Sequence, residues 1–167
     1  MTVEESRSKA KEYFTSGYNC SQSVFAVFAE MSGIEKSLAL KIAQGLGGGM
    51  GRQREVCGAV SGMIMALSLM IGNADPNDKE TKDNLYKVVQ ELSQKFREKN
   101  GSIICRELLG LVPMGQSEEA LKNKTPIEHF VENPVSEVRT AEYLKKRPCD
   151  ELCADACEIL CEWINNN

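Results

Sequence analysis

The chain has 167 residues, and its 20 basic and 24 acidic side chains give a net charge of −4 at pH 7. This length suits one hydrophobic core, so we expect a single cysteine-containing domain over residues 1–167. The acidic balance and the lack of a basic stripe argue against binding to nucleic acid or to an anionic membrane. The polar beginning of the sequence has no secretory signal. This predicts a cytoplasmic protein whose seven cysteines serve thiol, metal or catalytic chemistry rather than a disulfide framework.

Nearly every segment shows the periodicity of a helix, with apolar residues three and four positions apart. The first expected helix covers residues 3–14. The second begins after the cap residue Asn19, so Cys20 is its first helical residue. A shorter third helix covers residues 37–44.

The most apolar stretch of the chain follows a glycine-rich loop, GLGGGMG, at residues 45–51. It predicts a buried helix that begins near Val56 and ends at Gly72, with Cys57 in its first turn. The apolar run of about 16 residues is shorter than the roughly 20 that cross a bilayer, so no membrane span is expected. The loop lacks the GxGxxG spacing and a following Lys-Ser or Lys-Thr, so no nucleotide is expected. A loop that brings backbone close to the Cys57 sulfur is the better interpretation.

Three further helices complete the prediction. An amphipathic helix covers residues 77–99, and a short helix over residues 102–110 has Cys105 near its start. Residues 111–133 are predicted as loop and short helical turns. The last helix covers residues 148–163 and starts at a proline, a residue favoured at the first helical position. Together these segments predict an all-α fold, an irregular helical bundle of about five main helices.

Four cysteines share one predicted position, the first turn of a helix: Cys20, Cys57, Cys105 and Cys149. At a helix start, unpaired backbone N–H groups and the positive end of the helix dipole favour a thiolate over a thiol. Cationic neighbours act in the same direction, Arg54 beside Cys57 and Arg106 beside Cys105 among them. Such sulfurs can attack a disulfide or donate charge to a metal. The alternative for each is a structural role, because free cysteine often behaves as a small buried hydrophobe.

A second cysteine pattern, with a spacing of four, lies in the last expected helix: Cys149, Cys153, Cys157 and Cys161. Such a stripe is about 120° wide, which is the width of an ordinary core face. We therefore expect the last three of these cysteines to pack in the core.

Two weaker signals concern helix packing and catalysis. Gly58 and Gly62 lie four positions apart and predict a close helix crossing. His129 is the only histidine and has no cysteine near it in the sequence, so a Cys–His catalytic pair is not indicated.

Three short segments carry a resemblance that extends over nearly the whole chain: GYNCSQ at residues 17–22, CGAVSG at residues 57–62 and CRELLG at residues 105–110. Together with the glycine-rich loop and a late cysteine, they are similar to the C-GCAxxG-C-C family, described as redox-active proteins of bacteria and archaea. The resemblance implies a small helical protein with four functional cysteines, namely Cys20, Cys57, Cys105 and Cys149. It leaves open whether Cys149 or Cys153 is the fourth of them.

The leading hypothesis is a soluble redox protein in which these four cysteines converge and bind an iron–sulfur cluster or another thiolate-bound metal. A similar segment accompanies the haem-binding regions of split-Soret cytochromes, where an iron–sulfur site has been proposed. This chain has no CxxCH, so covalent haem is not expected.

Two other hypotheses stay open. The first is a thiol–disulfide oxidoreductase or redox sensor with Cys57 as nucleophile and a resolving thiol distant in sequence. Cys57 and Cys105 are then the candidate catalytic residues. The second is a non-catalytic, zinc-stapled helical interaction module. The redox hypotheses require a redox partner protein, which the sequence does not identify, and an exposed Gly58 and Gly62 face would suggest a homodimer.

Overall fold

Helices form nearly all of the regular structure in the computed structural model, which describes residues 1–29, 31–127 and 132–167. Five helices have ten or more residues: α1 (Val3–Thr15), α2 (Cys20–Ala29), α5 (Gly58–Ile71), α6 (Lys79–Asn100) and α10 (Cys149–Asn166). The shorter elements are α3 (Lys36–Ala43), the 3-10 turn η1 (Gln44–Leu46), α4 (Gly47–Met50), α7 (Cys105–Leu108), α8 (Gln116–Asn123) and α9 (Ala141–Lys146). The predicted all-α class is confirmed. Within the described ranges, β pairing is confined to one isolated antiparallel bridge, Val56 with Ile104.

Cap residues explain where the long helices begin. Asn19 caps α2, because its Oδ1 accepts a hydrogen bond from the Gln22 N–H at 3.1 Å and the Gln22 Oε1 accepts one from the Asn19 N–H at 3.0 Å. Cys57 lies one residue before α5 and is its N-cap, rather than a residue of its first turn. The last helix runs to Asn166, beyond the predicted end at Trp163, because residues 164–166 include neither glycine nor proline.

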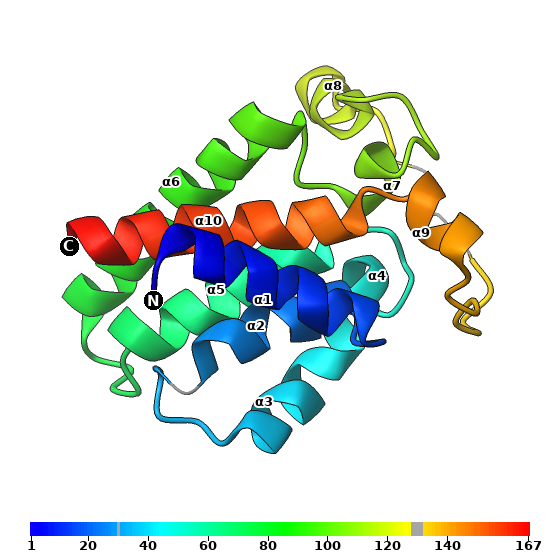
Figure 1. Cartoon of the computed structure of the whole chain (residues 1–167). Helices are drawn as coiled ribbons and strands as arrows, with labels where there is room; N and C mark the ends of the chain where they lie inside the picture. Colours follow the sequence, from blue (N-terminus) through cyan, green and yellow to red (C-terminus); the bar gives the residue numbers. More distant parts are fainter. Residues whose placement is uncertain (30, 128–131) are drawn as a thin grey trace.

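The long helices pack around α10, which crosses the middle of the molecule in Figure 1. Helix α1 lies along α10, while α2 packs against α5. Helix α6 packs on both α5 and α10. Cys20 and Cys149 are the first residues of α2 and α10, and Cys57 caps α5. The glycine-rich segment of α4 contacts both α2 and α5.

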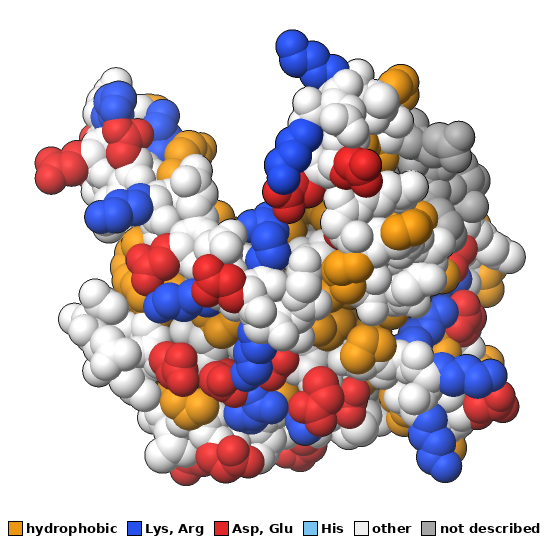
Figure 2. Space-filling model, turned by 90° about the horizontal axis from the view of Figure 1, so that it is seen from above, with side chains coloured by type: hydrophobic (Ala, Val, Ile, Leu, Met, Phe, Trp, Pro, Cys, Tyr) orange, Lys and Arg blue, Asp and Glu red, His pale blue; other side chains and the backbone are white. Residues whose placement is uncertain are grey.

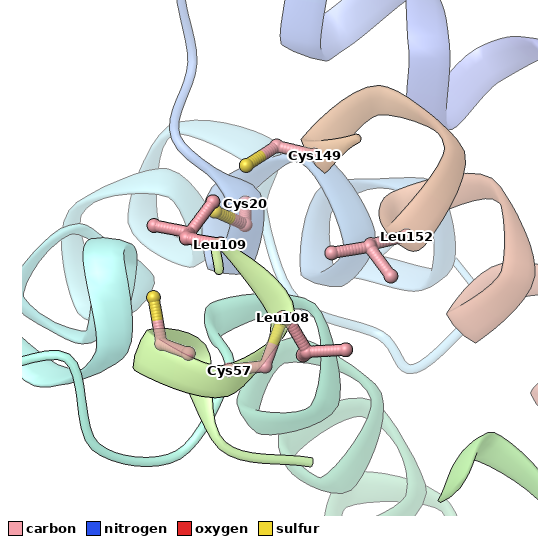
Figure 3. Close-up of a pocket in the computed structure, with 7 residues that line it drawn as sticks. Cys20, Cys57, Leu108, Leu109, Cys149 and Leu152 are labelled. Atoms are coloured by element: carbon pink, nitrogen blue, oxygen red, sulfur yellow. The ribbon is translucent and has the colours of Figure 1, made fainter. Parts of the chain in front are cut away.

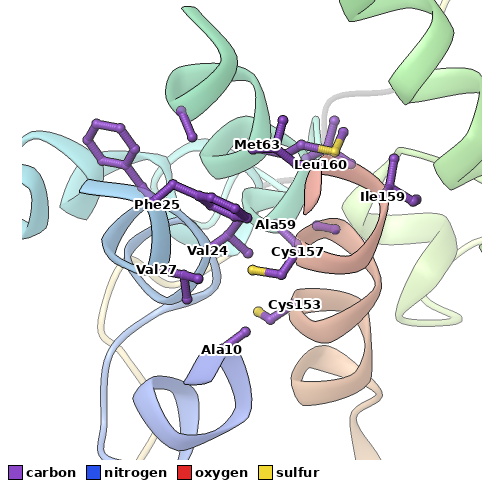
Figure 4. Close-up of a cluster of buried hydrophobic side chains, with 14 of the residues drawn as sticks. Ala10, Val24, Phe25, Val27, Ala59, Met63, Cys153, Cys157, Ile159 and Leu160 are labelled. Atoms are coloured by element: carbon purple, nitrogen blue, oxygen red, sulfur yellow. The ribbon is translucent and has the colours of Figure 1, made fainter. Parts of the chain in front are cut away.

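The hydrophobic core lies where α1, α2, α5 and α10 meet (Figure 4). The Cys157 sulfur points from α10 toward Val24 of α2, and Cys153 lies next to Ala10 of α1 (Figure 4). Cys153 and Cys157 have exposed fractions of 0%, and Cys161 has one of 2%. The expected core packing of these three cysteines is confirmed.

The predicted close crossing at Gly58 and Gly62 is confirmed, and its partner is α2. A methyl group on Gly62 would lie 2.7 Å from the carbonyl oxygen of Ser21 and 3.0 Å from Cβ of Val24. One on Gly58 would lie 3.2 Å from Cβ of Cys20. Helix α2 therefore covers this glycine face, and a homodimer would have to use another surface.

Replacing Gly62 with alanine should destabilise the protein by roughly 1–3 kcal/mol, because the added methyl group forces α2 and α5 apart. Gly45→Ala is the matched control, since a methyl group there meets no atom within 4 Å. Urea unfolding followed by circular dichroism measures both variants. Equal midpoints for the two would show that the α2 and α5 backbones are not in close contact.

No helix within the described residues combines the length and the apolar character that crossing a bilayer demands. On the face shown in Figure 2, acidic and basic side chains are interspersed, with small groups of apolar side chains between them.

Candidate functional site

Four cysteines from four helix starts line one small cavity: Cys20, Cys57, Cys105 and Cys149. Leu108, Leu109 and Leu152 complete the wall, so the lining is otherwise apolar (Figure 3). The volume is about 10 Å³, roughly the space of one water molecule. The helix-start pattern singled out these four residues, and the fold brings all of them to one place.

A short antiparallel pairing of two segments sets Cys57 close to Cys105. The Cys57 N–H donates to the Ile103 carbonyl at 2.8 Å, and the Cys105 N–H donates to the Glu55 carbonyl at 2.6 Å. Cys57 then caps α5 and Cys105 opens α7. The paired segments therefore place both cysteines in the wall of the cavity.

The glycine-rich loop is an ordered part of the site. Gly48 and Gly49 have φ angles of 65° and 69°, a backbone region that favours glycine. A methyl group on Gly49 would lie 2.7 Å from Cβ of Cys105, and one on Gly47 would lie 2.3 Å from Cγ of Asn19. The sequence pattern predicted that this loop lies against the Cys57 sulfur. In the structure Gly49 lies against Cys105, and Gly47 lies against Asn19, the cap of α2.

Cys20 is the sulfur whose surroundings favour the thiolate. Hydrogen bonds from the thiols of Cys149 and Cys153, aided by the Gly48 backbone N–H, hold the pKa of the Cys20 thiol well below its usual range. The Cys153 sulfur also lies 3.7 Å from the Cys20 carbonyl oxygen. Figure 3 shows the sulfurs of Cys20 and Cys149 next to each other. Of the two candidates for the fourth cysteine, Cys149 lines the cavity, whereas Cys153 packs in the core and contacts Cys20 from there.

The other three cavity cysteines favour the thiol. Burial, followed by the nearby charge of Cys20, raises the pKa of the Cys57 thiol and that of the Cys105 thiol. The hydrogen bond to Cys20, followed by burial, raises the pKa of the Cys149 thiol. At Cys57 the backbone N–H groups at the helix start act in the expected direction and lower the pKa of the thiol, but burial and the charge of Cys20 outweigh them. In an apolar cavity one thiolate is stabilised by its neighbours and opposes the ionisation of the rest.

The arginine contacts differ from those expected from sequence neighbours. Arg54 contacts the sulfur of Cys105, with Nη1 3.9 Å from Sγ, and so lowers the pKa of that thiol against the effect of burial. Arg106 turns away from the sulfurs and binds Glu55 at 2.7 Å and Ser117 at 3.1 Å. Its role is to hold α7 in place.

A larger pocket, which we call the vestibule, opens outside the cavity and has a volume of about 550 Å³. It shares Cys20, Cys105, Cys149 and Leu109 with the cavity. Its other lining residues include four arginines and a tyrosine, namely Arg52, Arg54, Arg139, Arg147 and Tyr143. The sequence interpretation missed Arg139 and Tyr143, because nothing in the local pattern around them marks a site.

Four cysteine sulfurs are a donor set that both iron–sulfur clusters and tetrahedral zinc sites use. Within the described residues, no group of three or more His, Cys, Asp or Glu side chains is placed to hold a metal ion. His129 lies outside the described residues. Four cysteines are nevertheless the donors that iron–sulfur clusters use, and a cluster spreads its thiolates over several metal atoms. The set therefore fits a cluster in number and chemistry.

A family model described as "Putative redox-active protein (C_GCAxxG_C_C)" matches residues 18–163. The matched range includes all four cavity cysteines. Comparison with curated proteins and with solved structures finds no match.

Proposed function

We propose, because the chain belongs to the C_GCAxxG_C_C family of redox-active proteins, that its redox centre is the cysteine cavity and that this centre holds an iron–sulfur cluster. The observation that carries the proposal is the convergence of four sulfurs, from four separate helix starts, on one otherwise apolar cavity. The ligands would be Cys20, Cys57, Cys105 and Cys149. When bound, the cluster would accept and release single electrons.

The residues of this chain would tune such a centre in two ways. Leu108, Leu109 and Leu152 exclude water from the cavity, and an apolar surrounding sets the redox potential of a bound centre. Arg54 places a positive charge 3.9 Å from the Cys105 sulfur and offsets part of the negative charge of four thiolates. Because the cavity measures only about 10 Å³, its lining would have to open to admit a cluster.

The zinc-stapled alternative would use the same four sulfurs, because a structural zinc is commonly held by four thiolates in a tetrahedron. Metal analysis separates it from the cluster.

Purification without oxygen, followed by iron, sulfide and zinc analysis and an absorption spectrum, tests the proposal. We expect iron and sulfide in stoichiometric amounts, lost in Cys57→Ser and kept in Cys161→Ser. Cys161 is the matched control because it is equally buried but lies outside the cavity. Metal-free wild-type protein, or equal iron loss in both variants, would count against a cluster. Stoichiometric zinc would favour the stapled module.

A second candidate, dithiol–disulfide exchange, is favoured by the contact between Cys20 and Cys149. The Cys20 thiolate would attack a partner disulfide, bond to one of its sulfurs and release the other as a thiolate. Cys149 would then lose its proton and attack the Cys20 sulfur, forming a protein disulfide and releasing the second partner thiolate. The partner gains two electrons and the protein loses two.

This pathway assigns the attack to Cys20 in place of Cys57. Cys57 has an exposed fraction of only 4%, and burial raises the pKa of its thiol, whereas Cys20 is half-buried and lines the vestibule. Mild oxidation followed by peptide mapping identifies the disulfide. A reversible Cys20–Cys149 bond supports this candidate, and an unchanged thiol count contradicts it.

A further inference from the structure

The vestibule concentrates positive charge in a protein that is acidic as a whole. Its lining includes Arg52, Arg54, Arg139 and Arg147, whereas Glu137 is the one acidic side chain among the described lining residues. Glu132 adds a second carboxylate from the rim by pairing with Arg54. Four guanidinium groups therefore face two carboxylates and the Cys20 thiolate, although the chain carries a net charge of −4.

The ion pairs within this group are shared. Glu132 pairs with Arg52 at 3.1 Å and also with Arg54, and Glu137 pairs with Arg52 at 3.5 Å and with Arg147 at 3.1 Å. Because a guanidinium has five N–H donors, two carboxylates shared in this way cannot saturate three arginines. The buried Nη2 of Arg54 touches Glu132 but makes no hydrogen bond of normal geometry among the described residues.

A second cationic position lies apart from these pairs. Arg139 donates to the Phe14 carbonyl at 2.6 Å, and its guanidinium lies 4.4 Å from the centre of the Phe14 ring. Arg147, which belongs to the first position through its pair with Glu137, also lies over an aromatic ring, 4.7 Å from the centre of Tyr143. Packing on aromatic rings fixes the direction of a guanidinium before a ligand arrives, which lowers the entropic cost of binding.

Backbone strain points to the same segment. Arg52 and Arg54 have φ angles of 68° and 60°, which are unusual for residues other than glycine. Such conformations cost free energy and occur preferentially at functional sites. They direct both arginines into the vestibule beside the glycine-rich loop.

We infer that the vestibule binds a small organic anion that carries at least two acidic groups. Arginine forks match carboxylates and phosphates, and the two separate cationic positions call for two such groups. A volume of about 550 Å³ is typical of small-molecule sites and too large for a lone inorganic ion. A ligand held in this way would lie against Cys20 and Cys149, so it is placed to react with the redox centre or to control access to it.

Calorimetric titration of the full chain with citrate, at low salt, tests this inference with a probe that carries several carboxylates. We expect saturable binding that weakens on addition of sodium chloride. Arg139→Gln and Arg147→Gln should each weaken it by about tenfold or more, since each removes a charge-assisted hydrogen bond. Arg97→Gln, a change outside the vestibule, should leave it intact. Inorganic phosphate, which is one compact anion and cannot reach both cationic positions, should bind more weakly than citrate.

A measurement on the unaltered chain keeps the inference testable if an arginine variant fails to fold. Citrate should slow the alkylation of Cys20 by iodoacetamide, because the occupied vestibule covers that sulfur. The inference would be overturned if citrate gave neither a binding heat nor protection of Cys20. It would also be overturned if phosphate bound as tightly as citrate, or if Arg97→Gln weakened citrate binding as much as the vestibule variants do. The alkylation is run on the reduced, metal-free chain, and calorimetry measures neither metal content nor disulfide formation, so failure of this inference is separable from failure of the proposed redox centre.

Discussion

Replacing Cys20 with serine should remove the fast alkylation of the reduced, metal-free protein near pH 7. In the wild type, hydrogen bonds from the Cys149 and Cys153 thiols hold the pKa of Cys20 below its usual range, so this sulfur is the first to exist as the reactive thiolate. Serine does not ionise in this range. The rate of the first modification should therefore fall by about tenfold or more, because the rate follows the thiolate fraction.

The pH dependence follows from the direction of each shift. A lowered pKa moves the alkylation midpoint of Cys20 below the value of about 8.5 for a free cysteine. A raised pKa moves the midpoint of Cys149 above it. Since the Cys20 charge contributes to that rise, the Cys149 midpoint should fall in Cys20→Ser.

Mass spectrometry of iodoacetamide-treated peptides between pH 5 and 10 measures these midpoints. Cys161→Ser serves as the control, because Cys161 lies outside the cavity. A wild-type profile in which Cys57 or Cys105 reacts before Cys20 would show that Cys20 is not the first cavity thiol to ionise.

Replacing Gly49 with alanine should destabilise the protein by roughly 2–5 kcal/mol. The new methyl group would lie 2.7 Å from Cβ of Cys105, 2.8 Å from the Glu55 nitrogen and 2.9 Å from Cα of Arg54. Two of these atoms are backbone and cannot rotate away. The φ angle of 69° adds strain for any side chain.

Gly33→Ala separates the two causes. Gly33 has a similar φ angle of 72°, but a methyl group there meets no atom within 4 Å. It should therefore show the strain alone, roughly 1–2 kcal/mol. Urea unfolding of both variants gives the difference. If Gly49→Ala is no less stable than Gly33→Ala, the glycine loop does not press against Cys105.

The helical class and the starts of several helices could be predicted because their signals are local. Asn19 and Gln22 lie three residues apart and cap α2 through each other's backbone, an interaction that any chain with this spacing can form. The stripe from Cys153 to Cys161 became a core face because residues four apart share one side of a helix. Gly58 and Gly62 likewise marked a close crossing, although the pattern did not name α2 as the partner.

The site could be predicted only in part. The positions of the four cysteines at helix starts are a local property, and the sequence by itself determined them. Their ionisation is a property of distance and burial. Desolvation and the charge of Cys20 raise the pKa of the Cys57 thiol more than its place at the start of α5 lowers it. The choice of Cys20 as the thiolate depends on Cys149 and Cys153, which are more than a hundred residues away in sequence.

The sequence therefore determined the all-α class, the caps and the set of candidate sulfurs, because each depends on neighbours within one or two helical turns. The tertiary structure alone decided three further features: the meeting of four sulfurs at one cavity, the single favoured thiolate and the basic vestibule beside it. These depend on contacts between segments far apart in the chain, such as Arg139 with Phe14. No local pattern encodes such contacts, because they exist only once α10 has packed on α1, α2 and α5.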